Sequence, residues 1–472
     1  MTTIESGSYL SIHPRIQIHI TPYGAKIAVP PANDDSGSES NLWPVAEVNK
    51  AARNLLLECD GTTILADVLS RVENQQDSGG FANDCIAFLE QAIQYGFISA
   101  SPVPIPTRIV TTGSTDFIVP QHVNVELTSN CNLKCIYCYR DAGPLVAAYL
   151  PVEQLLDIIK QFVQYGTRII ELTGGEPLLY PAFSRVVDFC ARHGSLVSVL
   201  SNGCLIDEQI VKQLANFRDH LFVQLDLDGS TASKHDYVRG VPGAFQQTTR
   251  SIALLAQYQV RTHVVMNVIP DTLDDVENTL RLARDLGATW FNFAPILPVG
   301  RANRLKLEYS LDQVKYMSEL PFYLGDKYKS FYRQLTQERL ARLTGSHTNN
   351  CGAGTRSLVL GPTGKIRPCL VLPEKYLVIG DATKQSVADI LSNPVLSFLH
   401  ELSSPGPGDC KGCIREMFCR YCYTRGLLAQ SKFESPCPWA KDNLIAEWFS
   451  LDHVSSEGMN NTCSGLCQWK PL

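Results

Sequence analysis

The sequence predicts an α/β protein built around a partial (βα)6, TIM-like barrel, with a small winged-helix-like domain before it and a cysteine-rich region after it. Three observations support this class. A hairpin pattern opens the chain, strand and helix signals alternate through its middle, and cysteines gather near its end. The predicted domains are residues 1–99, a linker at 100–119, the barrel at 120–310, a helical bridge at 311–345, and the cysteine-rich region with its tail at 346–472.

The N-terminal domain begins with a predicted hairpin. Residues 15–20 alternate polar and apolar, Gly24 can make the turn, and residues 26–30 form the returning strand. Three helices are expected to follow because apolar residues recur at helical spacing. They begin near Pro44, after Thr63 and at Phe81. A stretch rich in Pro, Thr, Ser and Gly then indicates a linker.

Six strand signals alternate with helical ones in the barrel region. The predicted strands are 123–127, 168–172, 196–200, 222–227, 263–268 and 290–294. Helical stretches between them include 152–165, 244–257 and 273–286. Function is expected at the C-terminal ends of such strands, where the loops converge. Residues 311–343 are mainly helical in pattern and interrupted at Pro321.

Composition limits the partners and the compartment. The 472 residues carry 41 Lys and Arg against 47 Asp and Glu, a net charge of -6, with no long basic run. Neither nucleic acid nor a membrane is therefore expected as a partner. We expect a cytoplasmic protein, because no signal-peptide or membrane-span pattern is present. In a reducing compartment, clustered cysteines among a total of 16 indicate metal ligation rather than disulfides.

The most informative motif directly follows the first barrel strand. Cys131, Cys135 and Cys138 have the spacing CxxxCxxC. Three thiolates can hold three irons of a 4Fe-4S cluster and leave the fourth iron open, whereas an electron-transfer cluster normally has four cysteine ligands. An open iron indicates chemistry at the cluster.

This spacing, with Asn132-Leu133 inside it and Tyr137 before the last cysteine, resembles the radical S-adenosylmethionine (SAM) superfamily. The resemblance implies that the open iron binds SAM, and that an electron from the cluster cleaves SAM to a 5'-deoxyadenosyl radical. It also places Tyr137 among the cofactor-binding residues. The cofactors implied are therefore SAM and a SAM-binding 4Fe-4S cluster.

Three further motifs match the same superfamily at the ends of later strands. The turn Gly174-Gly175-Glu176 resembles the motif that contacts the methionyl amino group of SAM, and its glycines permit close backbone approach. Ser201-Asn202 matches residues that contact the ribose. The resemblance makes Arg239 a partner for the SAM carboxylate; a solvated surface arginine is the alternative. Gly300 and Arg301 follow the sixth strand, where the family holds adenine, and receive no individual role.

A second set of cysteines resembles the SPASM domain, which carries two auxiliary iron-sulfur clusters. The resemblance assigns Cys351, Cys369 and Cys422 to the first cluster. To the second it assigns Cys410, Cys413, Cys419 and Cys437. Zinc is the rival metal, although the gap between the two CxxC pairs is shorter than in zinc ribbons. The first set lacks a fourth cysteine, which the tail residues Cys463 and Cys467 could supply.

Four isolated cysteines and the N-terminal domain lie outside these motifs. Isolated cysteines are expected to be small buried apolar residues; they are Cys59, Cys85, Cys190 and Cys204. The N-terminal order of elements, with Asn49-Lys50-Ala51 and 59–62, resembles the PqqD-like RiPP recognition element. In that family a leader peptide adds as a strand to the hairpin edge. The alternative is a winged-helix packing domain without a ligand.

These resemblances together predict a radical SAM enzyme that modifies a ribosomally made precursor peptide. The product could be a thioether or another side-chain crosslink, an epimer or an excision. The expected partners are the precursor peptide and an external one-electron donor such as flavodoxin or ferredoxin. One alternative is a radical SAM/SPASM enzyme that acts on a folded protein or a tetrapyrrole-like cofactor precursor. Another is a non-catalytic iron-sulfur or zinc scaffold.

Overall fold

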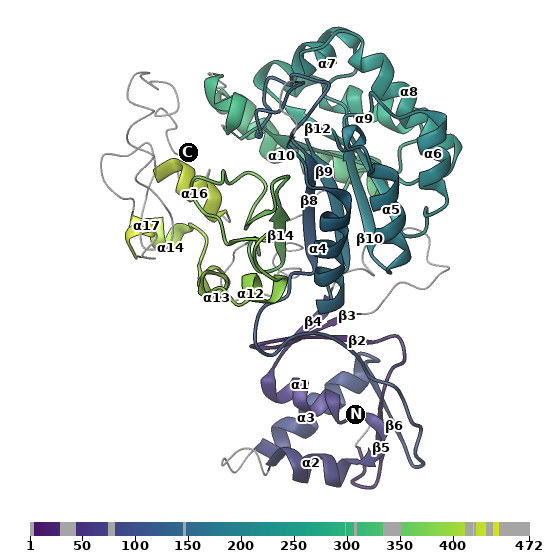
Figure 1. Ribbon diagram of the computed structural model, residues 1–472. Helices are drawn as coiled ribbons and strands as arrows, with labels where there is room; N and C mark the ends of the chain where they lie inside the picture. The colour runs from purple at the N-terminus through teal and green to yellow at the C-terminus, as the bar shows by residue number, and fades with distance from the viewer. Residues whose placement is uncertain are drawn as a thin grey trace. The chain divides into compact units, whose positions relative to one another are not determined.

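The computed structural model describes residues 4–28, 44–73, 81–144, 148–297, 299–305, 309–333, 351–410, 419, 422–430 and 438–442. These residues form two compact units, which divide after Val119 (Figure 1). The first unit is residues 1–119 and the second is 120–472. Among the described residues, no helix is long and apolar enough to cross a membrane.

The N-terminal unit contains two small sheets and three helices. One sheet has the order β5-β1-β6 and the other β4-β3-β2-β7. The strands are β1 (Tyr9–Ile12), β2 (Gln17–Thr21), β3 (Gly24–Ala28), β4 (Pro44–Asn49), β5 (Asp60–Ile64), β6 (Ile98–Ser101) and β7 (Val110–Gly113). The helices are α1 (Lys50–Leu57), α2 (Leu65–Glu73) and α3 (Phe81–Gln94). Apolar side chains from both sheets and all three helices share one core, which includes Leu10, Ile18, Ile27, Leu56 and Leu89.

The predicted hairpin is confirmed, because β2 and β3 pair antiparallel. The expected helix from Pro44 is wrong at its start: residues 44–49 form β4, and α1 begins only at Lys50, capped by the Asn49 side chain. Both outer edges of the hairpin are already paired, with β4 on β3 and with β7 on β2. The hairpin itself therefore offers no open edge to a peptide strand. Strand β7 also makes the stretch interpreted as a linker part of this unit.

The second unit is organised by a nine-stranded sheet of order β13-β12-β11-β10-β9-β8-β14-β15-β16. Its first six strands in the chain are parallel, as predicted. They are β8 (His122–Thr128), β9 (Ile169–Gly174), β10 (Leu196–Ser201), β11 (Leu221–Asp226), β12 (Thr262–Val268) and β13 (Trp290–Pro295). This arrangement confirms the predicted parallel α/β class.

Helices follow the strands and pack on the outside of the sheet (Figure 1). They are α4 (Val152–Tyr165), α5 (Phe183–Arg192), α6 (Glu208–Ala215), α7 (Ala232–Arg239), α8 (Ala244–Gln257), α9 (Val276–Asp285) and α10 (Leu311–Tyr328). Short 3-10 turns are η2 (Pro177–Leu179), η3 (Pro270–Asp275), η4 (Gly300–Arg304) and η5 (Lys329–Phe331). Helix α10 continues through Pro321, and residues 334–350 of the predicted bridge lie outside the described part.

The two faces of the parallel strands differ in polarity. One face is apolar and fully buried, as with Val123, Ile170 and Val197. On the other face, neighbouring strands bring Asn124, Glu171 and Ser198 into register, and the next strands add polar side chains such as Gln224 and Asn292. Strands buried on both faces normally show continuous apolar runs, and the polar side chains on the second face depart from that pattern. We call the polar face the lumen face.

The auxiliary cysteine region begins by extending the barrel sheet. Strand β14 (Ser357–Leu360) pairs in parallel with β8, and β15 (Lys365–Arg367) and β16 (Gly380–Asp381) continue antiparallel. Its helices are α12 (Val387–Leu391), α13 (Pro394–Glu401), α14 (Pro407–Cys410), α16 (Tyr423–Gln430) and α17 (Pro438–Asp442). The auxiliary cysteine region and the six parallel strands are therefore hydrogen-bonded through one sheet.

Candidate functional site

The three-cysteine loop leaves the C-terminal end of β8, as predicted, and packs against the end of α7. Lys134 and Ile136 donate their backbone N–H groups to the carbonyls of Arg239 and Val238, at 3.2 and 3.0 Å. Gly240 has φ +69, and a Cβ there would overlap the Lys134 carbonyl oxygen. A glycine after α7 is therefore what allows the loop to lie this close.

Cys131 is part of a buried cluster, and the partly buried Cys135 and Cys138 pack against it. Burial, together with the nearby Glu176, Cys135 and Cys138, raises the pKa of Cys131 to about 12. Ionising several such thiols together is costly without a cation, whereas a metal centre stabilises the thiolates. The donor set therefore fits an iron-sulfur cluster.

The Gly174-Gly175-Glu176 turn fixes the distance between β9 and the cysteine loop. The N–H groups of Gly175 and Glu176 donate to the carbonyls of Thr128 and Asn130, at 2.7 and 2.8 Å. A Cβ on either glycine would overlap one of these two carbonyl oxygens. The two glycines thus allow the turn after β9 to lie against the backbone that precedes Cys131.

The Glu176 carboxylate connects this turn to the end of the third barrel strand. It is fully buried and accepts hydrogen bonds from the Ser201 hydroxyl and the Asn202 N–H, both at 2.8 Å. Burial raises the pKa of Glu176 to about 7, although these donors oppose the rise. Its carboxylate is thus directed at the Ser201-Asn202 segment, and contact with SAM stays a prediction for Gly174, Gly175 and Glu176.

Asn202 links that segment to the cysteine loop. Its side-chain amide nitrogen lies 2.8 Å from Oδ1 of Asn132 and 3.8 Å from Sγ of Cys131. Its side-chain oxygen accepts from the Cys204 N–H, and its carbonyl accepts from the Thr248 hydroxyl. Ser201 and Asn202 therefore lie at the cysteine site, and their predicted ribose contact stays a prediction.

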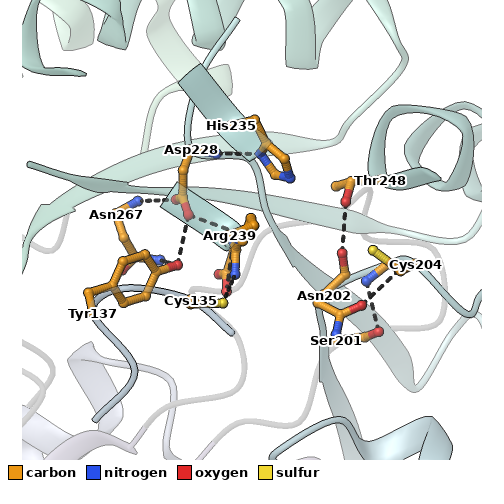
Figure 2. A network of polar contacts seen from close by, with 12 residues as sticks. Cys135, Tyr137, Ser201, Asn202, Cys204, Asp228, His235, Arg239, Thr248 and Asn267 are labelled. Carbon is orange, nitrogen blue, oxygen red and sulfur yellow. Dashed lines mark hydrogen bonds and ion pairs between the residues drawn. The ribbon is translucent and has the colours of Figure 1, made fainter. Parts of the chain in front are cut away.

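Arg239 is not a solvated surface residue; that alternative is wrong. Its side chain is 3% exposed, with Nε 2.9 Å from Asp228 and Nη2 3.2 Å from Asp226. Nη1 lies 3.6 Å from Sγ of Cys135 (Figure 2). The guanidinium also lies over the Tyr137 ring. Arg239 thus places a buried positive charge beside a cysteine sulfur; its predicted contact with the SAM carboxylate is untested.

Sequence reasoning gave no role to the carboxylate that organises this network (Figure 2). Asp228 is fully buried and accepts hydrogen bonds from the Tyr137 hydroxyl and the Asn267 N–H, both at 2.8 Å. Burial raises the pKa of Asp228 to about 6 although Arg239 opposes this. His235 accepts from the Asp228 N–H, and burial lowers its pKa to about 2, so it is neutral. The sequence signal that could have identified Asp228 is its position directly after a predicted barrel strand.

Arg301 clamps the cysteine loop from the side of β13. Its Nε donates to the Cys135 carbonyl at 2.8 Å, and Nη1 reaches both the Ala142 carbonyl and the Asp141 carboxylate. A Cβ on Gly300, whose φ is +59, would overlap the Cys138 and Tyr139 carbonyls. These residues therefore hold the loop backbone.

The auxiliary cysteines assigned to the first cluster also lie together. Burial raises the pKa of Cys351 to about 12, and the neighbouring Cys422 and Cys369 add to the rise. Cys410 and Cys419 are buried, whereas Cys413, Cys437, Cys463 and Cys467 lie outside the described residues. Among the isolated cysteines, Cys59, Cys85 and Cys190 are buried as expected, and the partly exposed Cys204 packs beside the three-cysteine site.

Comparison with known proteins identifies the two regions. Residues 125–283 match the radical SAM superfamily, and residues 351–414 match the SPASM iron-sulfur cluster-binding domain. The chain therefore contains regions similar to a radical SAM domain and to a SPASM domain, and it is an enzyme. These domains imply SAM and iron-sulfur clusters as its cofactors.

Two curated proteins and one solved structure are similar to most of this chain. AlbA, the antilisterial bacteriocin subtilosin biosynthesis protein of Bacillus subtilis, is 26% identical over 93% of this chain and 98% of its own length. The AdoMet-dependent heme synthase of Methanosarcina barkeri is 24% identical over 68% of this chain and 96% of its own length. Streptococcus suis SuiB, solved with its precursor peptide SuiA, has a similar fold, with a TM-score of 0.61 at 14% identity over 90% of this chain and 98% of SuiB.

Proposed function

We propose that this enzyme modifies a ribosomally made precursor peptide by radical chemistry. The observation that carries the proposal is the extent of the similarity to AlbA, which covers 93% of this chain and 98% of AlbA. The heme synthase is matched over 96% of its length but over only 68% of this chain, so it has no counterpart for the rest. A biosynthetic relative of nearly equal extent supports a peptide substrate over a tetrapyrrole precursor.

Cys131, Cys135 and Cys138 would hold a 4Fe-4S cluster, which together with SAM supplies a 5'-deoxyadenosyl radical that abstracts hydrogen from the substrate. The chain's own residues bind and orient. Leu133 N–H and the Asn202 amide face the Cys131 sulfur, at 3.4 and 3.8 Å. These donors would stabilise thiolate charge without changing position.

The fixed network around the cysteines supports a preorganised SAM site. Glu176 immobilises Ser201 and Asn202 from one side, and Asp228 immobilises Tyr137 and Arg239 from the other. Every one of these contacts is made within the chain, so little reorganisation is needed when the cofactor binds. We therefore propose that Glu176 and Asp228 position the residues that face SAM.

The lumen face supports a polar substrate. Ser198, Gln224 and Asn292 place hydroxyl and amide groups on the same face of the sheet as Asp226, which is 28% exposed beside Arg239. A peptide backbone presents many donors and acceptors, and buried groups of this kind satisfy them. We propose that the modified segment of the peptide enters this face.

The N-terminal unit would hold the leader of the peptide. Because the hairpin edges are paired, strand addition would use an outer strand of the sheet; we propose β4, which among the described residues pairs only with β3. Helix α1 follows β4 directly and contacts both β3 and β4. An edge strand beside a helix is a recurring place for peptide addition. Equal modification of leader-bearing and leaderless peptides by the full chain would contradict this assignment.

The SPASM region would carry two auxiliary clusters, on the two cysteine sets assigned above. Only three cysteines are available for the first set, so its fourth position is either open or filled by Cys463 or Cys467. Replacing both tail cysteines by Ala separates the two cases. Loss of roughly one cluster from the iron content would indicate closure by the tail, whereas unchanged iron and turnover would indicate an open iron.

The decisive experiment uses the anaerobically reconstituted chain, SAM and dithionite, which replaces a flavodoxin or ferredoxin as electron donor. A short peptide encoded beside the gene, with its leader, is the test substrate, and a tetrapyrrole precursor is the comparison. We expect 5'-deoxyadenosine together with a mass change in the peptide. Modification of the tetrapyrrole alone would favour the alternative function, and no 5'-deoxyadenosine at all would favour a non-catalytic scaffold.

A further inference from the structure

One buried carboxylate joins the two cysteine-bearing parts of the chain. Glu126 lies on β8, just before the three-cysteine loop, and its side chain is 0% exposed. Arg140 follows the loop, two residues after Cys138. Arg367 ends β15, two residues before Cys369. All three side chains meet at one point of the sheet.

Both ion pairs of Glu126 are short, and their two arginines differ in exposure. Nη1 of Arg140 lies 2.8 Å from Oε2 of Glu126, and Nη2 of Arg367 lies 2.5 Å from the same oxygen. Arg367 is 1% exposed and Arg140 15% exposed. The Tyr139 hydroxyl lies 3.5 Å from the other carboxylate oxygen. A carboxylate shared by two guanidinium groups is held more firmly than a single surface ion pair.

Arg367 extends this link into the loop that carries Cys369. Its Nη1 donates to the carbonyls of Leu370 and Leu372, at 3.3 and 2.9 Å. The backbone supports the same connection, because β8 pairs with β14 and the Asn124 amide donates to the Leu358 carbonyl. A movement of either cysteine segment therefore breaks contacts in the other.

Charge makes the link sensitive to Glu126 in particular. With the carboxylate present, the cluster of Arg140, Glu126 and Arg367 has a net charge of one positive unit. Removing that negative charge leaves the buried Arg367 and the partly buried Arg140 guanidinium groups near each other without this counterion. Both cysteine segments would then have to rearrange to separate them.

We propose that Glu126 is a positioning residue that couples the three-cysteine loop to the Cys369 segment, so that loss of its charge disturbs both iron-sulfur sites together. The inference rests on the ligand sets proposed above and is independent of whether the substrate is a peptide. Its tests therefore avoid the peptide reaction.

The first test uses hydrogen–deuterium exchange on the metal-free chain. Glu126→Gln should raise exchange in both 131–143 and 365–372. Arg367→Gln should also raise exchange in 131–143, although it lies in the other segment. Two controls remove carboxylate charge elsewhere: Asp275→Asn, a buried carboxylate that accepts from Ser230, and Glu153→Gln, an exposed partner of Arg185. Neither should change exchange in these two segments.

The second test measures the iron-sulfur sites directly in the reconstituted chain. Loss of the Glu126 charge should raise the midpoint potentials of the three-cysteine cluster and of the auxiliary cluster together, because added positive charge favours the reduced state. Glu126→Asp, which keeps the charge, should leave both potentials close to wild type. A purely structural role would not produce this rescue.

Arg140→Lys and Arg367→Lys keep the net charge and serve if Glu126→Gln fails to fold. Each should loosen both segments less than the corresponding change to Gln. An effect of Glu126→Gln or Arg367→Gln that is confined to its own segment, or equal to that of the controls, would overturn the proposal. A chain that passes these tests yet modifies no peptide would instead overturn the proposed substrate.

Discussion

The two cysteine sites are built in different ways. The first comes from one loop, and charged side chains surround it: Arg239 beside Cys135 and Glu176 near Cys131. The second gathers Cys351, Cys369 and Cys422 from distant parts of the chain, and the Arg425 backbone N–H donates to the Cys422 sulfur at 3.4 Å. The difference teaches that a buried arginine lies directly beside a sulfur at the first site, whereas burial is the largest influence at the second, where Arg356 lies near Cys351 and Thr424 is a hydrogen-bond partner of Cys369.

The largest expected effect separates the roles of the two sites. Replacing Cys131, Cys135 and Cys138 by Ala should abolish 5'-deoxyadenosine formation, because no other described cysteine set lies at the strand ends where SAM is expected. Replacing Cys351, Cys369 and Cys422 by Ala should preserve SAM cleavage and remove the peptide product. Chromatographic measurement of 5'-deoxyadenosine and product decides between the two sets. Equal loss of 5'-deoxyadenosine in both variants would contradict separate roles.

Arg239→Gln should be the most damaging single change near the first site. It leaves Asp228 and Asp226 without their buried counterion, which costs about 3–5 kcal/mol of unfolding free energy. Urea unfolding of the metal-free chain measures this. Arg185→Gln, which breaks an exposed pair with Glu153, should change the free energy of unfolding far less, because solvent screens exposed ion pairs. Similar values for both variants would show that Arg239 contributes little charge stabilisation.

The third prediction concerns how stability depends on pH through Glu171, which lies on β9 of the sheet that joins the two cysteine sites. Burial raises its pKa from 4.5 to about 7, so the folded state binds more protons than the unfolded state between these values. The contribution of Glu171 to the free energy of unfolding therefore falls as pH rises from 4.5 through 7, by at most about 3 kcal/mol. Glu171→Gln should remove this slope and be more stable than wild type at pH 8. Urea unfolding at pH 5 and pH 8 checks the difference, and identical slopes would contradict it.

The smallest expected effect lies at the second site. The Tyr423 hydroxyl donates to the Ala353 carbonyl at 3.2 Å, and the side chain is fully buried. Tyr423→Phe should lower the unfolding free energy by about 1 kcal/mol, the usual net value of one buried hydrogen bond. Iron content at the first site should not change. A larger loss of iron at the first site than at the second would contradict this local role of Tyr423.

Local patterns predicted much of this molecule. The strand and helix alternation located all six parallel strands to within two residues, because period and turn signals are local in sequence. The spacing of Cys131, Cys135 and Cys138 likewise predicted their clustering. The start of α1 was missed, because Pro44–Asn49 has apolar residues compatible with either a strand or a helix.

Interactions between distant residues could not be predicted in this way. Nothing near Arg239 in the sequence shows that its guanidinium is buried between Asp226 and Asp228, and the Glu126–Arg367 pair spans 241 positions. The same limit applies to Glu176, whose carboxylate faces Ser201 and Asn202 only because β9 and β10 are neighbours. Side-chain partners set by tertiary packing leave no periodic signal.

The pairing of β14 with β8 has a practical consequence for anyone who dissects this enzyme. Cutting the chain after the barrel would strip β8 of its neighbour and expose its hydrogen-bonding groups along residues 122–125. A newly bared strand edge readily recruits strands from other molecules, so such a truncated protein would aggregate. The barrel and the first strand of the SPASM region therefore have to be expressed and purified as one piece.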